Sequence, residues 1–232
     1  MRRVRMKGRN QGGARGILAL CLLLMGLGQA VASNEATSLA TPTLEPVRYQ
    51  VDAYYPPFTF ENDKFLFGFD PYLTNIIFTS DKYRLVYSTD AWENVYRRLV
   101  AGEIDLAGII AVTDERRQQV LFSEPLFNSY AALYTMRDFR SVEFDDIQSL
   151  RIGVGRGYYT ESILRNTLNI TDYVAYADIS EALDDLRAGR IDMIFENQQY
   201  MDNILIHRAI KGSVVAQVTN LFPRPHAYAV SM

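Results

Sequence analysis

The sequence contains very few side chains of the reactive or metal-binding kinds. Its 232 residues include one cysteine, Cys21, and two histidines, His207 and His226. Neither histidine has a cysteine or a second histidine at the spacing of a metal site, so we expect both to be ordinary surface residues and expect no metal or cofactor. A G-x-S-x-G motif is also missing. Little is left from which to build a metal-dependent or nucleophilic enzyme.

Long hydrophobic runs are equally scarce. The apolar run 17–27 follows six basic residues and precedes Ala30-Val-Ala32. This pattern predicts a secretory signal peptide over residues 1–32, cleaved after Ala32. The alternative is an uncleaved anchor, but a spanning helix needs about 20 apolar residues. Cleavage removes Cys21, and a chain without thiols suits an oxidising compartment such as the periplasm.

Basic residues are in the minority after that segment. The signal peptide contains 6 of the 24 basic residues and none of the 27 acidic ones, so its removal changes the formal net charge from −3 to −9. Such an acidic chain argues against nucleic acid or an anionic membrane surface as a partner. Residues 33–46 are polar and contain proline, which is typical of a linker.

The remaining residues alternate between strand and helix patterns, which predicts an α/β fold with parallel strands. The predicted strands are 47–53, 83–87, 104–110, 130–135, 150–154, 173–176, 191–195, 214–218 and 227–231. The predicted helices begin near residues 70, 91, 158, 179 and 197.

Capping signals mark several of these helices. Asp70 is the predicted N-cap of the first helix, with Pro71 at its first position. The apolar face of this helix is predicted from its spacing to be Leu73, Ile76 and Ile77. Two later helices each begin with an acid followed three residues on by a glutamate, which is a capping-box pattern. These pairs are Asp90 with Glu93 and Asp178 with Glu181.

One heptapeptide pattern, L-x-A-G-x-I-D, occurs twice. Its copies are residues 99–105 and 186–192, and each ends an amphipathic helix and starts an apolar strand. Two copies are too few for a solenoid. They favour two lobes built on the same plan.

The first copy leads to the strongest candidate binding residues. Strand 104–110, which contains Ile109, is followed by Thr113 and Arg116. Ligands of open α/β sheets bind at the carboxyl ends of strands, and an arginine fork there can hold a carboxylate. Arg117 is adjacent, and only one of the two arginines can face a cleft; the spacing alone does not choose between them.

Two further features near strand ends have alternative interpretations. Tyr55 and Trp92 either stack on a ligand or simply pack. Gly153-x-Gly155-x-Gly157 lacks the spacing of a dinucleotide fingerprint. The alternative hypothesis is that the backbone amides at the start of the helix at Tyr158 bind an anion other than a dinucleotide.

These motifs together resemble the family 3 extracytoplasmic solute-binding proteins, over residues 47–232. The most specific matches are Thr113-Asp-Glu-Arg116 and Phe122-Ser-Glu-Pro125. The supporting matches are Tyr55-Pro-Pro-Phe58, Gly68-Phe-Asp70, the two heptapeptides and Gly153-Val-Gly-Arg-Gly157.

The resemblance implies two α/β lobes, at about 47–132 and 137–225, that close on a ligand. Two crossing strands are implied near 130–136 and 227–232. Arg116 would bind the ligand's α-carboxylate together with the backbone at Tyr158 and Tyr159, and Thr113 belongs to the same ligand-binding set. Tyr55 and Trp92 would stack on the ligand, and Ile109 and Asn197 complete the implied ligand-binding set.

Three departures from the family pattern stand out. A hydroxyl residue near the carboxylate is replaced by Ala111, and the acid that holds the α-ammonium is replaced by Asn197. On an extended chain the neighbouring Glu196 points the other way. The sequence also ends at the return crossing, so by this resemblance it is truncated or is the front of a longer protein.

The implied function is therefore capture of a small carboxylate-bearing solute for a membrane permease, by a protein that is not an enzyme and is expected to be a monomer. One alternative is the input domain of a membrane sensor. Another is an enzyme related to the cyclohexadienyl dehydratases, for which Glu196 or Glu161 would be the general acid.

Overall fold

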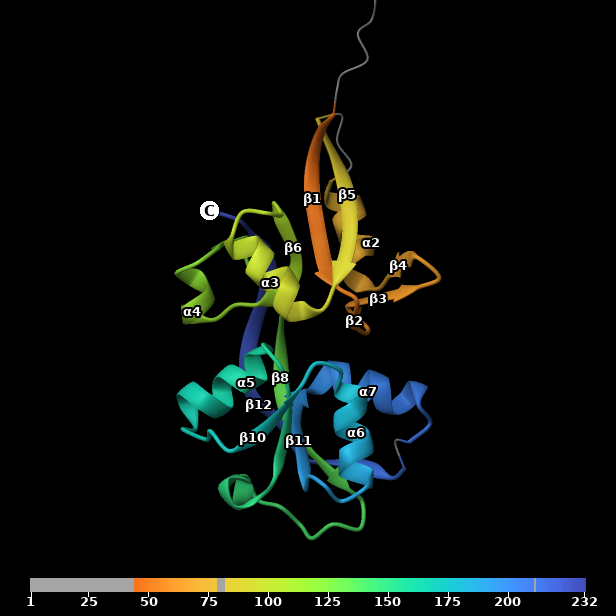
Figure 1. Ribbon diagram of the computed structural model, residues 1–232, viewed down its shortest axis with the longest axis vertical. Coiled ribbons are helices and arrows are strands. Elements are labelled where there is room, and N and C mark those ends of the chain that lie inside the picture. Colours follow the sequence, from red (N-terminus) through yellow and green to blue (C-terminus); the bar gives the residue numbers. More distant parts are fainter. Residues whose placement is uncertain (1–43, 79–81, 211) are drawn as a thin grey trace, which may run out of the picture. The chain divides into compact units, whose positions relative to one another are not determined.

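The computed structural model describes residues 44–78, 82–210 and 212–232 (Figure 1). The predicted signal peptide lies outside the described residues. The predicted linker ends earlier than expected, because Glu45 and Pro46 already belong to the first strand. None of the described helices is long and apolar enough to cross a membrane.

Nine strands of the described residues form one mixed sheet, in the order β10-β9-β11-β8-β12-β6-β1-β5 with β7 beside β12. These strands are β1 Glu45–Asp52, β5 Tyr83–Asp90, β6 Leu106–Ala111, β7 Leu121–Phe122, β8 Phe127–Met136, β9 Ile152–Gly155, β10 Tyr173–Tyr176, β11 Met193–Asn197 and β12 Val214–Val230. A smaller sheet contains β2 Tyr54–Tyr55, β3 Thr59–Asn62 and β4 Phe65–Phe67.

The first lobe is built on β1, β5 and β6, which run parallel. Every residue of β6 is buried, as its continuous apolar sequence predicts. Helices α2 (Phe69–Ile77), α3 (Trp92–Val100) and α4 (Asp114–Arg117) belong to this lobe. Its core comprises two clusters, one around Val95 and Leu99 of α3 and one around Tyr49 of β1.

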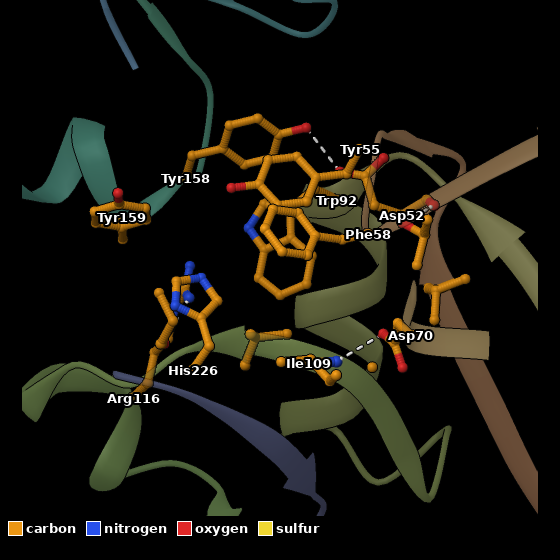
Figure 2. A pocket seen from close by; sticks show the side chains of 15 residues that line it. Asp52, Tyr55, Phe58, Asp70, Trp92, Ile109, Arg116, Tyr158, Tyr159 and His226 are labelled. Carbon is orange, nitrogen blue, oxygen red and sulfur yellow. Dashed lines mark hydrogen bonds between the residues drawn. The ribbon is translucent and has the colours of Figure 1, made fainter. Parts of the chain in front are cut away.

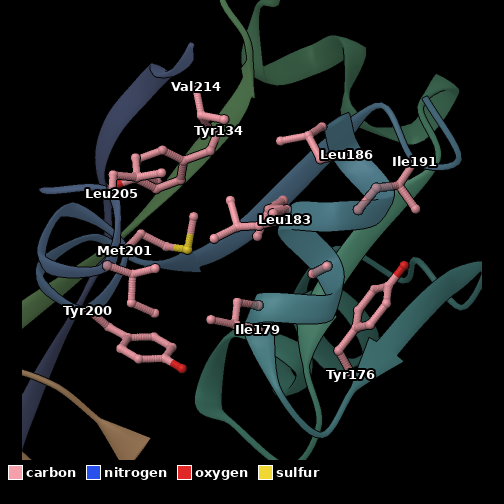
Figure 3. Close-up of a cluster of buried hydrophobic side chains, with 14 residues drawn as sticks. Tyr134, Tyr176, Ile179, Leu183, Leu186, Ile191, Tyr200, Met201, Leu205 and Val214 are labelled. Atoms are coloured by element: carbon pink, nitrogen blue, oxygen red, sulfur yellow. The ribbon is translucent and has the colours of Figure 1, made fainter. Parts of the chain in front are cut away.

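The second lobe repeats this plan with the parallel strands β9, β10 and β11. Its helices are α5 (Tyr159–Ser162), α6 (Ile179–Arg187) and α7 (Gln198–His207), with a π-turn η2 (Ile163–Thr167) after α5 and a 3₁₀ turn η1 (Phe144–Ser149) after β8. Figure 3 shows Leu183 and Leu186 of α6 facing the side chains of α7 and β8 in the larger core cluster.

Two antiparallel strands, β8 and β12, join the lobes and lie side by side (Figure 1). β12 pairs with β8 from Val214 to His226 and with β6 of the first lobe from His226 to Val230. The two predicted strands at the end of the sequence are thus one irregular strand, with several register shifts. The two crossing connections implied by the resemblance correspond to β8 and β12.

The heptapeptide copies form the same junction in both lobes. Gly102 and Gly189 end their helices with positive φ angles of 69° and 70°, which suit glycine. Asp105 then accepts hydrogen bonds from the backbone N (2.7 Å) and Nη2 (2.6 Å) of Arg48. Asp192 accepts the same pair of bonds from Arg151, at 2.9 and 2.6 Å.

The predicted N-caps at Asp70 and Asp90 are wrong. Gly68 precedes α2, and Asp70 is the second residue of the helix. Ala91 precedes α3, where the Asp90 carboxylate accepts from the Ala91 backbone N instead. By contrast, the cap at Asp178 is confirmed, since its side chain accepts from Ser180 N at 2.7 Å.

The predicted apolar face of α2 is wrong at two of its three positions, whereas Leu73 packs against the core cluster around Tyr49. Ile76 and Ile77 are 55% and 52% exposed. The buried positions of this helix are Asp70, Pro71 and Thr74 instead. Polar residues point inward because Asp70 and Thr74 bond to Tyr49 of β1, and Thr74 also bonds to Tyr228 of β12.

Candidate functional site

A cavity of about 40 Å³ lies where side chains of both lobes meet (Figure 2). Residues of the first lobe, two tyrosines of the second lobe and His226 of β12 line it. They are Val51, Asp52, Tyr55, Phe58, Thr59, Asp70, Trp92, Gly108, Ile109, Ile110, Ala111, Arg116, Tyr158, Tyr159 and His226. The carboxyl ends of β1 and β6 contribute, which is where ligands bind in such sheets.

Arg116 is the buried cation of this cavity. α4 begins with Thr113, whose side chain accepts from the Arg116 backbone N at 3.2 Å. This short helix turns the Arg116 side chain inward, where it is only 7% exposed. Arg117 is exposed, so the structure separates the two adjacent arginines.

Within the part of the chain that the structure describes, the hydrogen-bond and ring partners of the Arg116 guanidinium are uncharged. Nη1 donates to the carbonyl of Ala111 at 2.9 Å and Nη2 to the carbonyl of Gly157 at 3.1 Å. The rings of Trp92 and Tyr96 lie 5.0 and 5.1 Å from it, within cation–π range. No ion pair among the described residues includes Arg116. Burial lowers the pKa of Arg116, against a smaller opposing effect of the Glu115 charge, and so disfavours the charged form of the guanidinium.

Trp92 and Tyr55 both line the cavity. The indole Nε1 of Trp92 donates to the Gly157 carbonyl at 2.8 Å, a bond from the first lobe to the second. Tyr55 stacks on Phe58, with ring centroids 5.3 Å apart, and also contacts Tyr158 and Tyr200 of the second lobe. Aromatic side chains therefore form much of the wall.

Asp52 is a cavity residue that the sequence analysis missed as a functional candidate. Its Oδ1 accepts from the Tyr54 backbone N at 3.0 Å and its Oδ2 from the Tyr158 hydroxyl at 2.7 Å. Burial raises the pKa of Asp52. The sequence did contain a signal for Asp52, because this residue stands at the carboxyl end of the first predicted strand. The same kind of position was the reason for selecting Arg116.

The other acid of the cavity wall, Asp70, has a structural role. Its carboxylate accepts from the Ile109 backbone N at 2.7 Å and from the hydroxyls of Tyr49 and Thr74 at 2.9 and 3.0 Å. These bonds join α2 to β1 and β6. The backbone N of Ile109, a predicted ligand-binding residue, is therefore already engaged.

His226 is a second residue missed from sequence. Its ring stacks on Phe127, with centroids 5.2 Å apart, and its Nδ1 lies 3.2 Å from the Ser129 hydroxyl. Burial lowers the pKa of His226 to about 4, so the imidazole is neutral near pH 7. The prediction that His226 is a surface residue is wrong, because its side chain is buried in β12.

Two residues of the predicted set have side chains outside the cavity wall. Thr113 caps α4, as described above. Asn197 is buried and caps α7, accepting from the Tyr200 backbone N at 3.0 Å. Its Nδ2 lies 3.5 Å from the Tyr159 hydroxyl, so it contacts a cavity residue without lining the cavity itself.

The backbone amides at the start of α5, a hypothetical anion site, are bound in part by the protein's own carboxylates. Gly155 N donates to Glu196 at 3.0 Å, and Gly157 N donates to Glu161 at 2.6 Å. Glu196 is fully buried and also accepts from Thr160. Neither glutamate lines the cavity. Within the described part of the chain, no group of three or more metal-ligating side chains occurs.

Two α/β lobes joined by crossing strands, with a cavity between them, define a solute-binding protein of the type 2 periplasmic fold. Residues 47–169 match the family model described as bacterial extracellular solute-binding proteins, family 3. The chain belongs to this family. Membership implies an extracytoplasmic location.

Individual relatives agree with this assignment. The chain is 29% identical over 189 residues to the lysine/arginine/ornithine-binding periplasmic protein of Escherichia coli (strain K12), covering 79% of this chain and 70% of the relative. It is 30% identical over 143 residues to the arginine-binding periplasmic protein of Mannheimia haemolytica, covering 61% and 58%. Among solved structures, a histidine kinase sensor domain with similarity to periplasmic binding proteins superposes with a TM-score of 0.75 at 20% identity, covering 82% of this chain and 83% of that one.

Proposed function

We propose that this protein captures an amino acid, or a similarly small carboxylate-bearing solute, and delivers it to an ABC-type importer in the membrane. One observation carries the proposal: Arg116 is buried in an aromatic cavity, and none of its partners among the described residues is an anion. A buried charge needs a counter-charge to offset its lost hydration. A ligand carboxylate is the partner that a guanidinium fork fits best.

The names of the relatives support an amino-acid ligand, since both relatives described above are binding proteins for basic amino acids. Binding would proceed by lobe closure. Arg116 and Trp92 of the first lobe both reach Gly157 of the second, so the complete wall exists only with the lobes together. A ligand that contacts both lobes shifts the population toward that state.

The test begins with a thermal-shift screen of the protein against amino acids and small organic acids. A ligand at about 100 times its dissociation constant stabilises by about 2.7 kcal/mol, which is readily detected. Calorimetry with the ligand found then compares Arg116→Ala with Arg117→Ala. Loss of two charge-assisted bonds, at about 1.5–3 kcal/mol each, is expected to weaken binding at least about 100-fold.

Arg117→Ala is the matched control, because Arg117 is the exposed neighbour on the same turn. It is expected to bind like the wild type. The reverse ranking of the two variants would contradict the assignment of Arg116. A screen that yields no carboxylate-bearing ligand for the folded protein would contradict the proposed function itself.

A second candidate function is ligand detection as the input domain of a membrane sensor. The structural similarity to a histidine kinase sensor domain favours it, since that similarity spans four-fifths of both chains. The complete gene distinguishes the two functions. A sensor gene encodes a further apolar span of about 20 residues and a signalling domain, whereas an importer subunit does not.

A further inference from the structure

Tyr158 closes one end of the cavity. Its hydroxyl donates to Asp52 Oδ2 at 2.7 Å, the bond drawn between the upper side chains in Figure 2. In that view Arg116 lies on the other side of the Trp92 ring. Both residues line the same cavity, so its two ends differ: one presents a cation, and the other a carboxylate covered by a tyrosine.

The Tyr158 ring is held on several sides. It lies against the backbone of Gly155, where an added Cβ would come within 2.3 Å of the ring atom Cδ2. The rings of Tyr55 and Tyr200 pack against it edge-on, with centroids 5.2 and 6.0 Å away. Together with the bond to Asp52, these contacts fix the ring as part of the wall.

The remaining space is small. A cavity of about 40 Å³ has room for about three water molecules. An extended arginine or lysine side chain needs more of this space than a short side chain such as that of alanine or serine. The cavity acid that could pair with a cationic side chain is Asp52, since Asp70 joins α2 to the sheet. Tyr158 occupies the Oδ2 atom of Asp52.

We propose that Tyr158 is a specificity-determining residue that restricts the ligand to amino acids with short, uncharged side chains. It does so by filling the end of the cavity at Asp52 and by bonding to that carboxylate. The inference rests on the proposed function, since it takes Arg116 as the partner of the ligand carboxylate. It separates this protein from its relatives named for basic amino acids.

The experiment measures binding of glycine, L-alanine, L-serine and L-arginine by calorimetry to four proteins. These are the wild type, Tyr158→Ser, the double variant Asp52→Asn/Tyr158→Ser, and Tyr54→Ser. The last is the matched control, because Tyr54 is a half-exposed tyrosine next to this site that does not line the cavity.

The wild type and Tyr54→Ser are expected to bind at least one small amino acid at least tenfold more tightly than L-arginine. Tyr158→Ser is expected to reverse this order, because it vacates the ring volume and leaves Asp52 facing the cavity. The double variant Asp52→Asn/Tyr158→Ser is expected to bind L-arginine at least tenfold more weakly than Tyr158→Ser does.

Each contrary result is informative. A wild type that prefers L-arginine overturns the inference without any variant, and this result stands even if Tyr158→Ser fails to fold. A folded Tyr158→Ser that keeps the wild-type order also overturns it, while binding of a small amino acid leaves the proposed function intact. If neither the wild type nor folded Tyr158→Ser binds any of the four probes, the inference fails, while the proposed function is decided separately by the wider thermal-shift screen.

Discussion

The indole Nε1 of Trp92 lies 2.8 Å from the carbonyl oxygen of Gly157, and this bond joins the two lobes directly. The same oxygen accepts from Arg116 Nη2 at 3.1 Å. Gly157 has a φ angle of +73°, a conformation that suits glycine. The residue that would hold a ligand carboxylate is thus coupled, through one backbone carbonyl, to contact between the lobes.

Replacing Trp92 by phenylalanine keeps an aromatic wall but removes the donor to Gly157. Loss of one hydrogen bond costs about 1 kcal/mol, so the closed state should be weakened by about fivefold. We expect a matching loss of affinity in calorimetry and a larger radius of gyration in small-angle scattering. Tyr96→Phe is the control, since it removes a hydroxyl whose bond to Gln119 stays within the first lobe. Equal effects of the two variants would contradict a role for the Gly157 contact in closure.

Replacing Gly108 by alanine tests the close packing of β6 against the Asp70 side chain of α2. An added Cβ would come within 1.8 Å of Asp70 Oδ2 and 2.9 Å of a Val51 methyl carbon. Overpacking and the disturbed Asp70 bonds should lower the unfolding free energy by about 2–3 kcal/mol. Gly212→Ala is the control, because a Cβ there meets nothing within 4 Å. A denaturant midpoint for Gly108→Ala that matches this control would show that Asp70 does not depend on the glycine.

Glu196 should make the unfolding free energy depend on pH. Burial raises its pKa from 4.5 to about 7. Between about pH 4.5 and 7 the folded state keeps a proton that the unfolded state has lost, so stability falls as pH rises through that window. The loss attributable to Glu196 is on the order of 3 kcal/mol. Above pH 7 both states are ionised and the contribution is constant.

His226 changes the pH dependence of the unfolding free energy in the opposite direction. Its pKa is lowered from 6.5 to about 4. Between these values the unfolded state binds the extra proton, so stability rises with pH. The two groups therefore partly cancel in the wild type. Urea titrations at a series of pH values should show a steeper rise between pH 4.5 and 6.5 for Glu196→Gln than for the wild type. The exposed Glu93→Gln is the control; a Glu196→Gln profile parallel to both would exclude the buried-acid effect.

Much of the fold follows from local patterns. The buried strand β6 and the helix ends at Gly102 and Gly189 depend on residues close in sequence, and those predictions hold. The errors at α2 have a different origin. Asp70 and Thr74 face inward because Tyr49 and Ile109 offer them partners that are distant in sequence. A hydrophobic periodicity cannot register a polar network of that kind.

The candidate site was predictable in the same uneven way. Arg116 follows a buried strand, and family resemblance rather than spacing distinguished it from Arg117. Asp52, Tyr158 and His226 become neighbours of the cavity only when β1, the start of α5 and β12 come together. Tyr158 was expected to contribute through its backbone, whereas its hydroxyl bonds to Asp52. Local sequence patterns do not predict a side-chain contact with a residue of the opposite lobe.

The matched arginine–aspartate junctions lie within the lobes and not between them. Arg48 with Asp105, and Arg151 with Asp192, fasten neighbouring strands at the sheet ends remote from the cavity. Movement of one lobe against the other therefore leaves these bonds intact. The strain of turning then falls on β8 and β12, whose ladder slips register three times between Ala216 and Arg224. We therefore expect the lobes to move against each other by bending in these two strands.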